Sequence, residues 1–183
     1  EYIERTNLRI DIMRFTKELL RADRRTIGRL DSRFKGIDHD AAGEVHEYDP
    51  SLTNITGPYT ATFNDYVRGW LNYESDLPYE TLNPRVWPWS YAEFENQFVN
   101  VSDTLRKAMT INPYLKLYIA NGYYDMATPY FATEYTIAHL GLDASLRSNI
   151  SMGYYEAGHM MYVHLPSLAK LKDELTRFVR AAA

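Results

Sequence analysis

The sequence predicts an α/β protein whose two halves differ in architecture. Up to about residue 110, apolar residues recur mainly at helical spacing. From 111 to 183, short β-prone runs alternate with helical ones in the order β-loop-α-β-loop-α, the pattern of a parallel strand pair in a doubly wound sheet. We therefore expect a mainly helical region, 1–110, followed by the C-terminal βαβα part of a doubly wound domain, 111–183.

The composition is that of an ordinary globular protein and excludes several classes. The 183 residues are 45% hydrophobic, enough for a core, and carry a formal charge of −4. Without a long basic run we expect no nucleic-acid partner, and without an apolar stretch of about 20 residues we expect no membrane partner. The absence of cysteine excludes disulfides, thiolate zinc sites and a cysteine nucleophile. We interpret the densest basic cluster as a solvated or salt-bridged helix face: Arg21, Arg24, Arg25, Arg29 and Arg33.

The first half contains three expected helices. The first carries an apolar stripe from Leu8 to Leu19, with Thr6 or Asn7 as N-cap. Residues 31–60 are rich in Gly, Pro and Asp, which predicts a long surface connection. The second helix spans 63–71, where Gly69 costs about 1 kcal/mol.

The third helix begins at a capping box formed by Ser90 and Glu93 and runs to Met109. A stiff aromatic turn rich in proline, with Trp87 and Trp89, precedes it.

In the second half the period changes. Strands are expected at 115–120 and 149–154. The helix between them should begin at Pro129, with Thr128 as its cap, and stop at Gly141. A last amphipathic helix begins at Pro166. Because two strands alone make a poor sheet, we expect further strands to come from chain outside this sequence.

Asp125 and His159 each follow one of these strands, where a doubly wound protein collects its chemistry. An acid followed by a histidine is the last two thirds of a Ser-Asp-His hydrolase in chain order, but no Gly-x-Ser-x-Gly motif occurs. The sequence thus reads as part of an enzyme. The alternatives are that Asp125 only caps the Pro129 helix and that His159 is a satisfied core histidine.

No cofactor is expected. Glu156, His159 and His164 do not have the spacing of a recognised metal site, so no metal is expected either. We interpret the remaining histidines as surface residues: His39, His46 and His139.

Two motifs in the C-terminal third resemble those of the serine carboxypeptidases of peptidase family S10. The acid-loop pattern Gly-x-x-Asp-x-x-x-Pro-x-x-Ala-Thr-x-Tyr is matched by Gly122, Asp125, Pro129, Ala132, Thr133 and Tyr135. The histidine-loop pattern is matched by Ala157, Gly158, His159 and Met160, with Glu156 in place of a glycine. Bacterial members are most similar, because Tyr155 to Tyr162 and Asn112 to Lys116 also match their motifs.

The resemblance implies an α/β-hydrolase fold in which 1–110 is a cap insertion. It further implies a peptide substrate, catalytic roles for Asp125 and His159, and Met160 in the leaving-group pocket, although Met160 also suits a plastic core filler. The resemblance to bacterial members also implies a periplasmic or secreted location. The family's serine and oxyanion hole lie upstream, so the missing N-terminal half of the same polypeptide is an expected partner.

Other readings remain open. One fold hosts many chemistries, so an esterase or acyltransferase is an alternative, as is a non-catalytic peptide-binding or interaction module with the aromatic region as its surface. If the chain is part of an enzyme, we expect the Asp125 carboxylate within hydrogen-bond reach of the His159 ring, directly or through one water. We also expect a homodimer through the exposed sheet edge.

Overall fold

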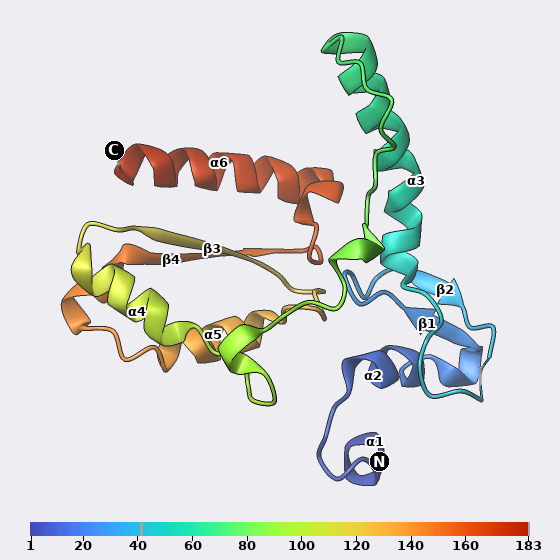
Figure 1. Ribbon diagram of the computed structural model, residues 1–183. Coiled ribbons are helices and arrows are strands. Elements are labelled where there is room, and N and C mark those ends of the chain that lie inside the picture. Colours follow the sequence, from blue (N-terminus) through green and yellow to red (C-terminus); the bar gives the residue numbers. More distant parts are fainter. Residues whose placement is uncertain (41, 183) are drawn as a thin grey trace. The chain divides into compact units, whose positions relative to one another are not determined.

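The computed structural model describes residues 1–40 and 42–182 (Figure 1). It divides into two compact units, one made of residues 1–51 and 102–183 and the other of residues 52–101. The expected division near residue 110 separates a cap insertion from the C-terminal part of a larger hydrolase domain, and it stays a prediction. The mixture of helices with a small parallel sheet agrees with the α/β class.

The sheet that carries the candidate site is formed by β3 (Leu117–Gly122) and β4 (Ile150–Tyr155). The strands are parallel, with Leu117 opposite Ile150 and Gly122 opposite Tyr155. The connection between them contains α5 (Tyr130–Ala138) and the short 3-10 helix η5 (Ala144–Asn149). This confirms the predicted strand pair, displaced by one or two residues. Gly141 has the expected positive φ, +66°, but α5 ends earlier than predicted, at Ala138 with His139 as its C-cap.

Helices cover both faces of this sheet (Figure 1). On one face lies α6 (Leu165–Ala182), whose Glu174 accepts hydrogen bonds from Tyr118 of β3 and Tyr155 of β4. On the other face lie α5 and α4 (Ser102–Ile111), and there Ile150 packs against a core that includes Met109. The side chains alternate because successive residues of a strand point to opposite faces. The unit is therefore a three-layer α/β/α arrangement.

The N-terminal segment contains the helix expected from the Leu8 to Leu19 stripe, but that helix begins at Ile12 and a short helix precedes it. The segment forms α1 (Tyr2–Arg5) and α2 (Ile12–Glu18), separated by Asn7 and Leu8 with φ angles of 52° and 62°. The second helix begins where the Asp11 side chain accepts the amides of Met13 and Arg14. A left-handed backbone at Leu8 cannot belong to a right-handed helix, so the first residue of the apolar stripe is left out of α2.

An antiparallel hairpin follows, made of β1 (Arg25–Ile27) and β2 (Lys35–Ile37). The interpretation of the arginine cluster as a helix face is therefore wrong beyond the 3-10 helix η1 (Arg21–Asp23). The surface connection expected over 31–60 is also wrong, because it contains β2 and most of α3 (Pro50–Asp65). The missed start signal is Asp49, which accepts the Ser51 amide, followed by proline at the first helical position.

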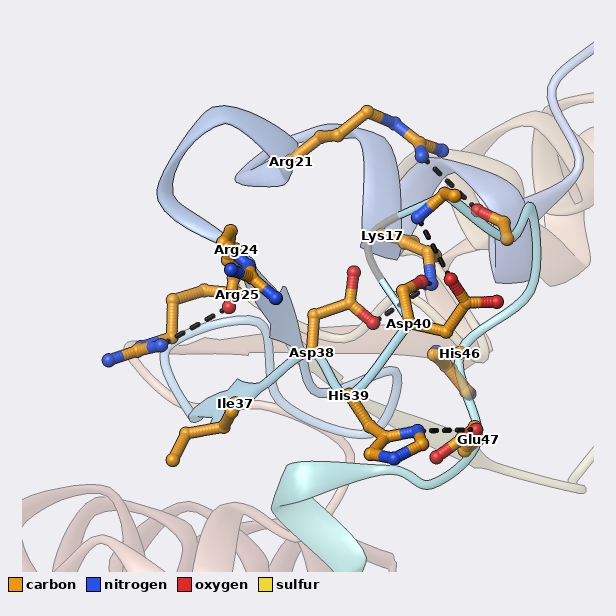
Figure 2. Close-up of polar contacts among 12 residues, drawn as sticks. Lys17, Arg21, Arg24, Arg25, Ile37, Asp38, His39, Asp40, His46 and Glu47 are labelled. Carbon is orange, nitrogen blue, oxygen red and sulfur yellow. Dashed lines mark hydrogen bonds and ion pairs between the residues drawn. The ribbon is translucent and has the colours of Figure 1, made fainter.

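The interior beside this hairpin is polar (Figure 2). Lys17 has a fully buried side chain, and its ammonium lies 2.8 Å from Asp38 Oδ1 and also bonds the Asp40 carbonyl. His46 is buried as well, with Nδ1 2.8 Å from the Thr16 hydroxyl, so its interpretation as a surface residue is wrong. Burial lowers the pKa of His46, which keeps the ring neutral. His39, by contrast, is exposed beside Glu47.

The second unit holds most of α3, then a π-helical turn η2 (Tyr66–Trp70) and two 3-10 helices, η3 (Pro84–Val86) and η4 (Ala92–Phe94). The helix expected over 63–71 is thus the end of a longer one. The helix expected over 90–109 is broken, since Ala92 and Asn96 have φ angles of 48° and 61°, and only 102–111 is α-helical at its end. Several large side chains of this unit are exposed: Tyr66, Trp70, Trp87, Trp89 and Phe98.

Candidate active site

Two loops leave the carboxyl ends of β3 and β4, and they touch each other. The acid loop is 123–129 and the histidine loop is 156–160. The Tyr124 amide donates to the Ala157 carbonyl at 3.0 Å. At Gly122 a Cβ atom would lie 2.3 Å from the Gly158 carbonyl oxygen, so the close approach of the two loops requires glycine there. The parallel register thus places the two loops side by side.

Asp125 lies between these loops with its carboxylate fully hydrogen-bonded. Oδ1 accepts the amides of Ala127 and Thr128 at 2.8 and 2.9 Å. Oδ2 accepts the Thr128 hydroxyl at 2.6 Å and lies 2.9 Å from His159 Nδ1. The residue is only 6% exposed. The expected hydrogen bond between Asp125 and His159 is therefore confirmed.

The expected cap of α5 is wrong. The helix begins at Tyr130 with Pro129 at its N-cap position and no side-chain cap. The Thr128 hydroxyl instead faces Asp125, so Thr128 belongs to the site. An Asx turn, in which a carboxylate accepts amides two and three residues later, holds the acid loop.

Opposing effects act on the Asp125 carboxyl group, and the net result is a lowered pKa. Burial raises the pKa, but the hydrogen bonds from the Thr128 side chain and amide, from His159 and from the Ala127 amide lower it further. The group is therefore a carboxylate at neutral pH, able to orient an imidazole and to stabilise its protonated form.

His159 is held by one side of its ring. Nδ1 faces Asp125, and the Thr128 oxygen is also 3.2 Å from that nitrogen. Because a carboxylate only accepts, Nδ1 carries a proton, and in the neutral ring Nε2 then has the lone pair of a base. The His159 side chain is 46% exposed, and over residues 1–40 and 42–182 no hydrogen bond to Nε2 is formed. Nε2 is thus free to exchange a proton with a bound molecule.

Met160 follows directly and is partly buried at the start of the 3-10 helix Met161–Val163 (η6). The methionine that enters the core is its neighbour Met161, which packs with Tyr155 and Ala157. The role of Met160 in lining a leaving-group pocket stays a prediction.

The sequence interpretation missed a third segment at this site. Asp31 is 2% exposed and accepts the Gly158 amide at 3.0 Å, while Arg33 donates to the Glu156 carbonyl at 2.8 Å. Arg33 also stacks over the Tyr124 ring at 4.9 Å. The only sequence signal is the alternation of Asp31 with arginines, which we interpreted as solvated charge. The ion pair with buried Asp31 raises the pKa of Arg33 against the smaller effect of its own desolvation.

Other ionisable groups nearby form no second centre. His164 Nδ1 lies 2.8 Å from the buried Ser167 hydroxyl. Among the described residues, no group of three or more His, Asp or Glu side chains is arranged to hold a metal ion. None of the helices formed by the described residues is long and apolar enough to cross a membrane.

Chemically, the arrangement is an oriented general base: an ionised acid, an imidazole with its proton directed to that acid, and an open Nε2. Such a pair activates a hydroxyl or water placed at Nε2. No protein-family model, curated protein or solved structure matches this chain.

Proposed function

We propose that this chain supplies the acid and the histidine of a Ser-Asp-His triad in a serine carboxypeptidase-like hydrolase of the α/β-hydrolase fold. The observation that carries the proposal is the 2.9 Å contact between Asp125 Oδ2 and His159 Nδ1 on loops at the carboxyl ends of adjacent parallel strands. The motifs around both residues add support, because they resemble those of the S10 family.

In this reaction His159 Nε2 takes the proton of the attacking serine and returns it to the leaving amine of a C-terminal residue. Asp125 keeps the proton on Nδ1 and stabilises the imidazolium. The acyl-enzyme is then hydrolysed by water, which His159 activates in the same way. An enzyme of this kind would act on peptides in the periplasm or outside the cell.

The serine and the oxyanion hole would come from upstream polypeptide, since this chain has no Gly-x-Ser-x-Gly motif. Loss of the nucleophile of a serine protease costs about 10⁶-fold in kcat, so we expect the 183-residue chain alone to be inert toward a blocked dipeptide. Adding the upstream half, expressed separately or in one chain, should restore hydrolysis.

Variants of the two proposed catalytic residues are compared with a variant of a histidine outside the site. In the restored enzyme, Asp125→Asn should lower kcat by about 10⁴-fold, and His159→Ala should abolish turnover. His139→Ala should leave it unchanged, because that exposed ring stacks on Tyr135 of α5. Robust hydrolysis by the isolated chain that His159→Ala abolishes would mean that a nucleophile within it has been overlooked. Hydrolysis of esters but not of peptides would favour the esterase or acyltransferase alternative.

A second candidate is a non-catalytic peptide-binding module, favoured by the exposed aromatic side chains of residues 52–101. Trp70, Trp87 and Trp89 are each more than half exposed. Aromatic side chains on a surface are typical of binding sites. Titration with short peptides, followed by NMR, separates the two: shifts at His159 support the hydrolase, and shifts confined to Trp87 through Tyr91 support the module.

A further inference from the structure

The connection between β1 and β2 lies against both loops of the candidate site. We call residues 29–33 the strap. Its start is fixed by Asp49, whose Oδ2 accepts the amides of Arg29 and Leu30 at 3.1 and 3.3 Å. The strap is about 90 or more positions away from the loops in sequence, yet all three belong to the same compact unit.

Its contacts with the acid loop lie on either side of Asp125. The Ser32 amide donates to the Tyr124 carbonyl, and the Met126 amide donates to the Arg29 carbonyl, both at 3.0 Å. The residues before and after the acid are therefore bonded to the same short piece of backbone.

Its contacts with the histidine loop lead up to His159 in the same way. The His159 amide donates to the Leu30 carbonyl at 2.7 Å, and the Gly158 amide donates to Asp31 Oδ2 at 3.0 Å. At Gly158 a Cβ atom would lie 2.3 Å from the Leu30 oxygen, so the strap approaches as closely as glycine permits. The backbone on both sides of Asp125 and the backbone at His159 are thus hydrogen-bonded to the same short segment, the strap.

Asp31 is held in turn by Arg33. The guanidinium donates from Nε to Oδ1 at 3.0 Å and from Nη2 to Oδ2 at 2.7 Å. Such a two-point ion pair fixes direction as well as distance. Because Arg33 also bonds the Glu156 carbonyl and stacks on Tyr124, its one side chain reaches both loops.

We propose that the strap is the positioning element for the Asp125–His159 pair, with Asp31 as its principal residue. In the part of the chain that the structure describes, no hydrogen bond joins Asp31 to the ring or the carboxylate of the pair, and Asp31 acts through the backbone of Gly158. Removing its side chain leaves the buried Gly158 amide without its acceptor and the Arg33 guanidinium without its counter-ion, so the histidine loop is held less firmly. The catalytic consequence rests on the proposed function, whereas the geometric consequence does not.

The test uses amide hydrogen exchange and the His159 Nδ1–H resonance by NMR on the 183-residue chain. Asp31→Ala should speed exchange at Gly158 and His159 by at least about tenfold and broaden or shift the Nδ1–H signal. Asp31→Asn, which keeps an oxygen for the Gly158 amide, should restore part of the protection. Arg33→Met alters a partly exposed side chain, and it should show the same trend if Asp31→Ala does not fold.

The control is Met109→Ala, which opens the separate core shared with Leu140 and Leu142. It should destabilise the unit without selective loss at Gly158 and His159. The proposal is overturned if exchange at these amides is unchanged in Asp31→Ala or Arg33→Met, or if Met109→Ala raises it equally.

In the enzyme restored with the upstream half, Asp31→Asn should lower kcat while leaving KM nearly unchanged. This is the result expected when the catalytic groups are misplaced but substrate binding is kept. If the wild-type assembly shows no hydrolysis but the exchange pattern holds, the proposed function fails and the positioning role stands. If hydrolysis is present and Asp31→Asn affects only KM, the positioning role fails.

Discussion

At the scale of single residues, the Asp125 carboxylate shows how a buried acid remains charged. Each oxygen accepts from two donors. Both donors to Oδ1 belong to the acid loop, whereas Oδ2 faces the Thr128 hydroxyl of that loop and the ring of His159. These bonds outweigh the burial that opposes ionisation, so the pKa lies below the ordinary 3.8. The charge is therefore a property of the acid loop as much as of the pair.

A lowered pKa makes Asp125 a source of pH-dependent stability. A carboxyl group whose pKa is lower in the folded than in the unfolded state stabilises fully above the unfolded value, and this contribution is lost as pH falls through the folded value. We expect the free energy of unfolding of the wild type to fall below about pH 4 more steeply than that of Asp125→Asn. Urea denaturation between about pH 2 and 6 measures both slopes.

The control for that series is Asp143→Asn, which removes an exposed carboxylate that accepts the Ser145 amide at the start of η5. In Asp143→Asn, the part of the pH dependence of the unfolding free energy that comes from Asp125 should remain. Equal slopes for wild type and Asp125→Asn would contradict the assignment.

Lys17 and Asp38 form a second buried pair with a different role. Both side chains are almost completely inaccessible, and the pair ties α2 to the end of the hairpin. Removal of one member leaves a buried charge without a counter-ion, so Lys17→Met should destabilise by about 3–5 kcal/mol. The double variant Lys17→Met with Asp38→Leu should recover most of that loss, because an apolar pair needs no charge compensation.

A double-mutant cycle by urea denaturation measures this coupling. Lys170→Met is the matched single change, since Lys170 is half exposed and lies 3.9 Å from Glu174. It should cost no more than about 1 kcal/mol. A similarly small cost for Lys17→Met would show that the pair is solvated in solution.

At the scale of secondary-structure elements, the sequence predicted those parts that are determined by nearby residues. Strand, turn and helix signals gave β3, α5, β4 and α6 within one or two residues, and with them the Asp125–His159 contact. Prediction from the sequence failed where the structure depends on contacts between residues far apart in the chain. In the sequence, Asp31 and Arg33 look like surface charges. Their role becomes visible only in the fold, where Asp31 accepts the amide of Gly158, 127 residues later. Periodicity contains no information about such contacts.

The same limit explains the errors in the predicted helices. The Leu8 stripe and the Ser90 capping box are correct local signals, but residues with positive φ delay the start of the first predicted helix and interrupt the second. Apart from proline, residues differ in helical propensity by no more than about 1 kcal/mol, so a few tertiary contacts override it.

Glycine substitutions test how tightly the elements meet at the site. In Gly122→Ala, the new Cβ would lie 2.3 Å from the Gly158 oxygen and 2.6 Å from the Ala157 oxygen, both backbone atoms that cannot rotate away. We expect a loss of about 1–3 kcal/mol and separation of the two loops. In Gly57→Ala, no atom lies within 4 Å of the new Cβ in α3, and a gain of up to about 1 kcal/mol is expected.

Thermal unfolding followed by circular dichroism measures both glycine variants, and the His159 Nδ1–H resonance reports on the loops. An unchanged resonance and midpoint in Gly122→Ala would mean that the loops are looser than their contact distance indicates.

At the scale of the whole molecule, the β3–β4 sheet poses the remaining question. Within the described chain it has two strands, so each strand has one edge whose backbone groups pair with no other strand. Helices cover its two faces (Figure 1). An open edge recruits another strand, and in the proposed hydrolase that strand would come from the upstream half.

In the absence of that half, a second copy of this chain is the most available partner. We expect a homodimer or swapped oligomer at micromolar concentration, in which residues 111–160 provide much of the contact, because two-fold pairing is the commonest closure. Sedimentation velocity measures the state. Ser151→Lys places a charge at an exposed position of β4 and should weaken association, whereas Ala181→Lys adds the same charge near the end of α6 and should not.

In the proposed hydrolase, the upstream half should compete with this self-association, because both would occupy the same edge. Its addition should therefore convert the dimer to a one-to-one complex and restore hydrolysis in the same concentration range. A monodisperse monomer with both strands protected from hydrogen exchange would contradict this prediction. It would mean that the helices of the chain already shield the sheet, and that residues 1–51 and 102–183 form a self-sufficient domain in which the Asp125–His159 pair needs no second polypeptide for its stability.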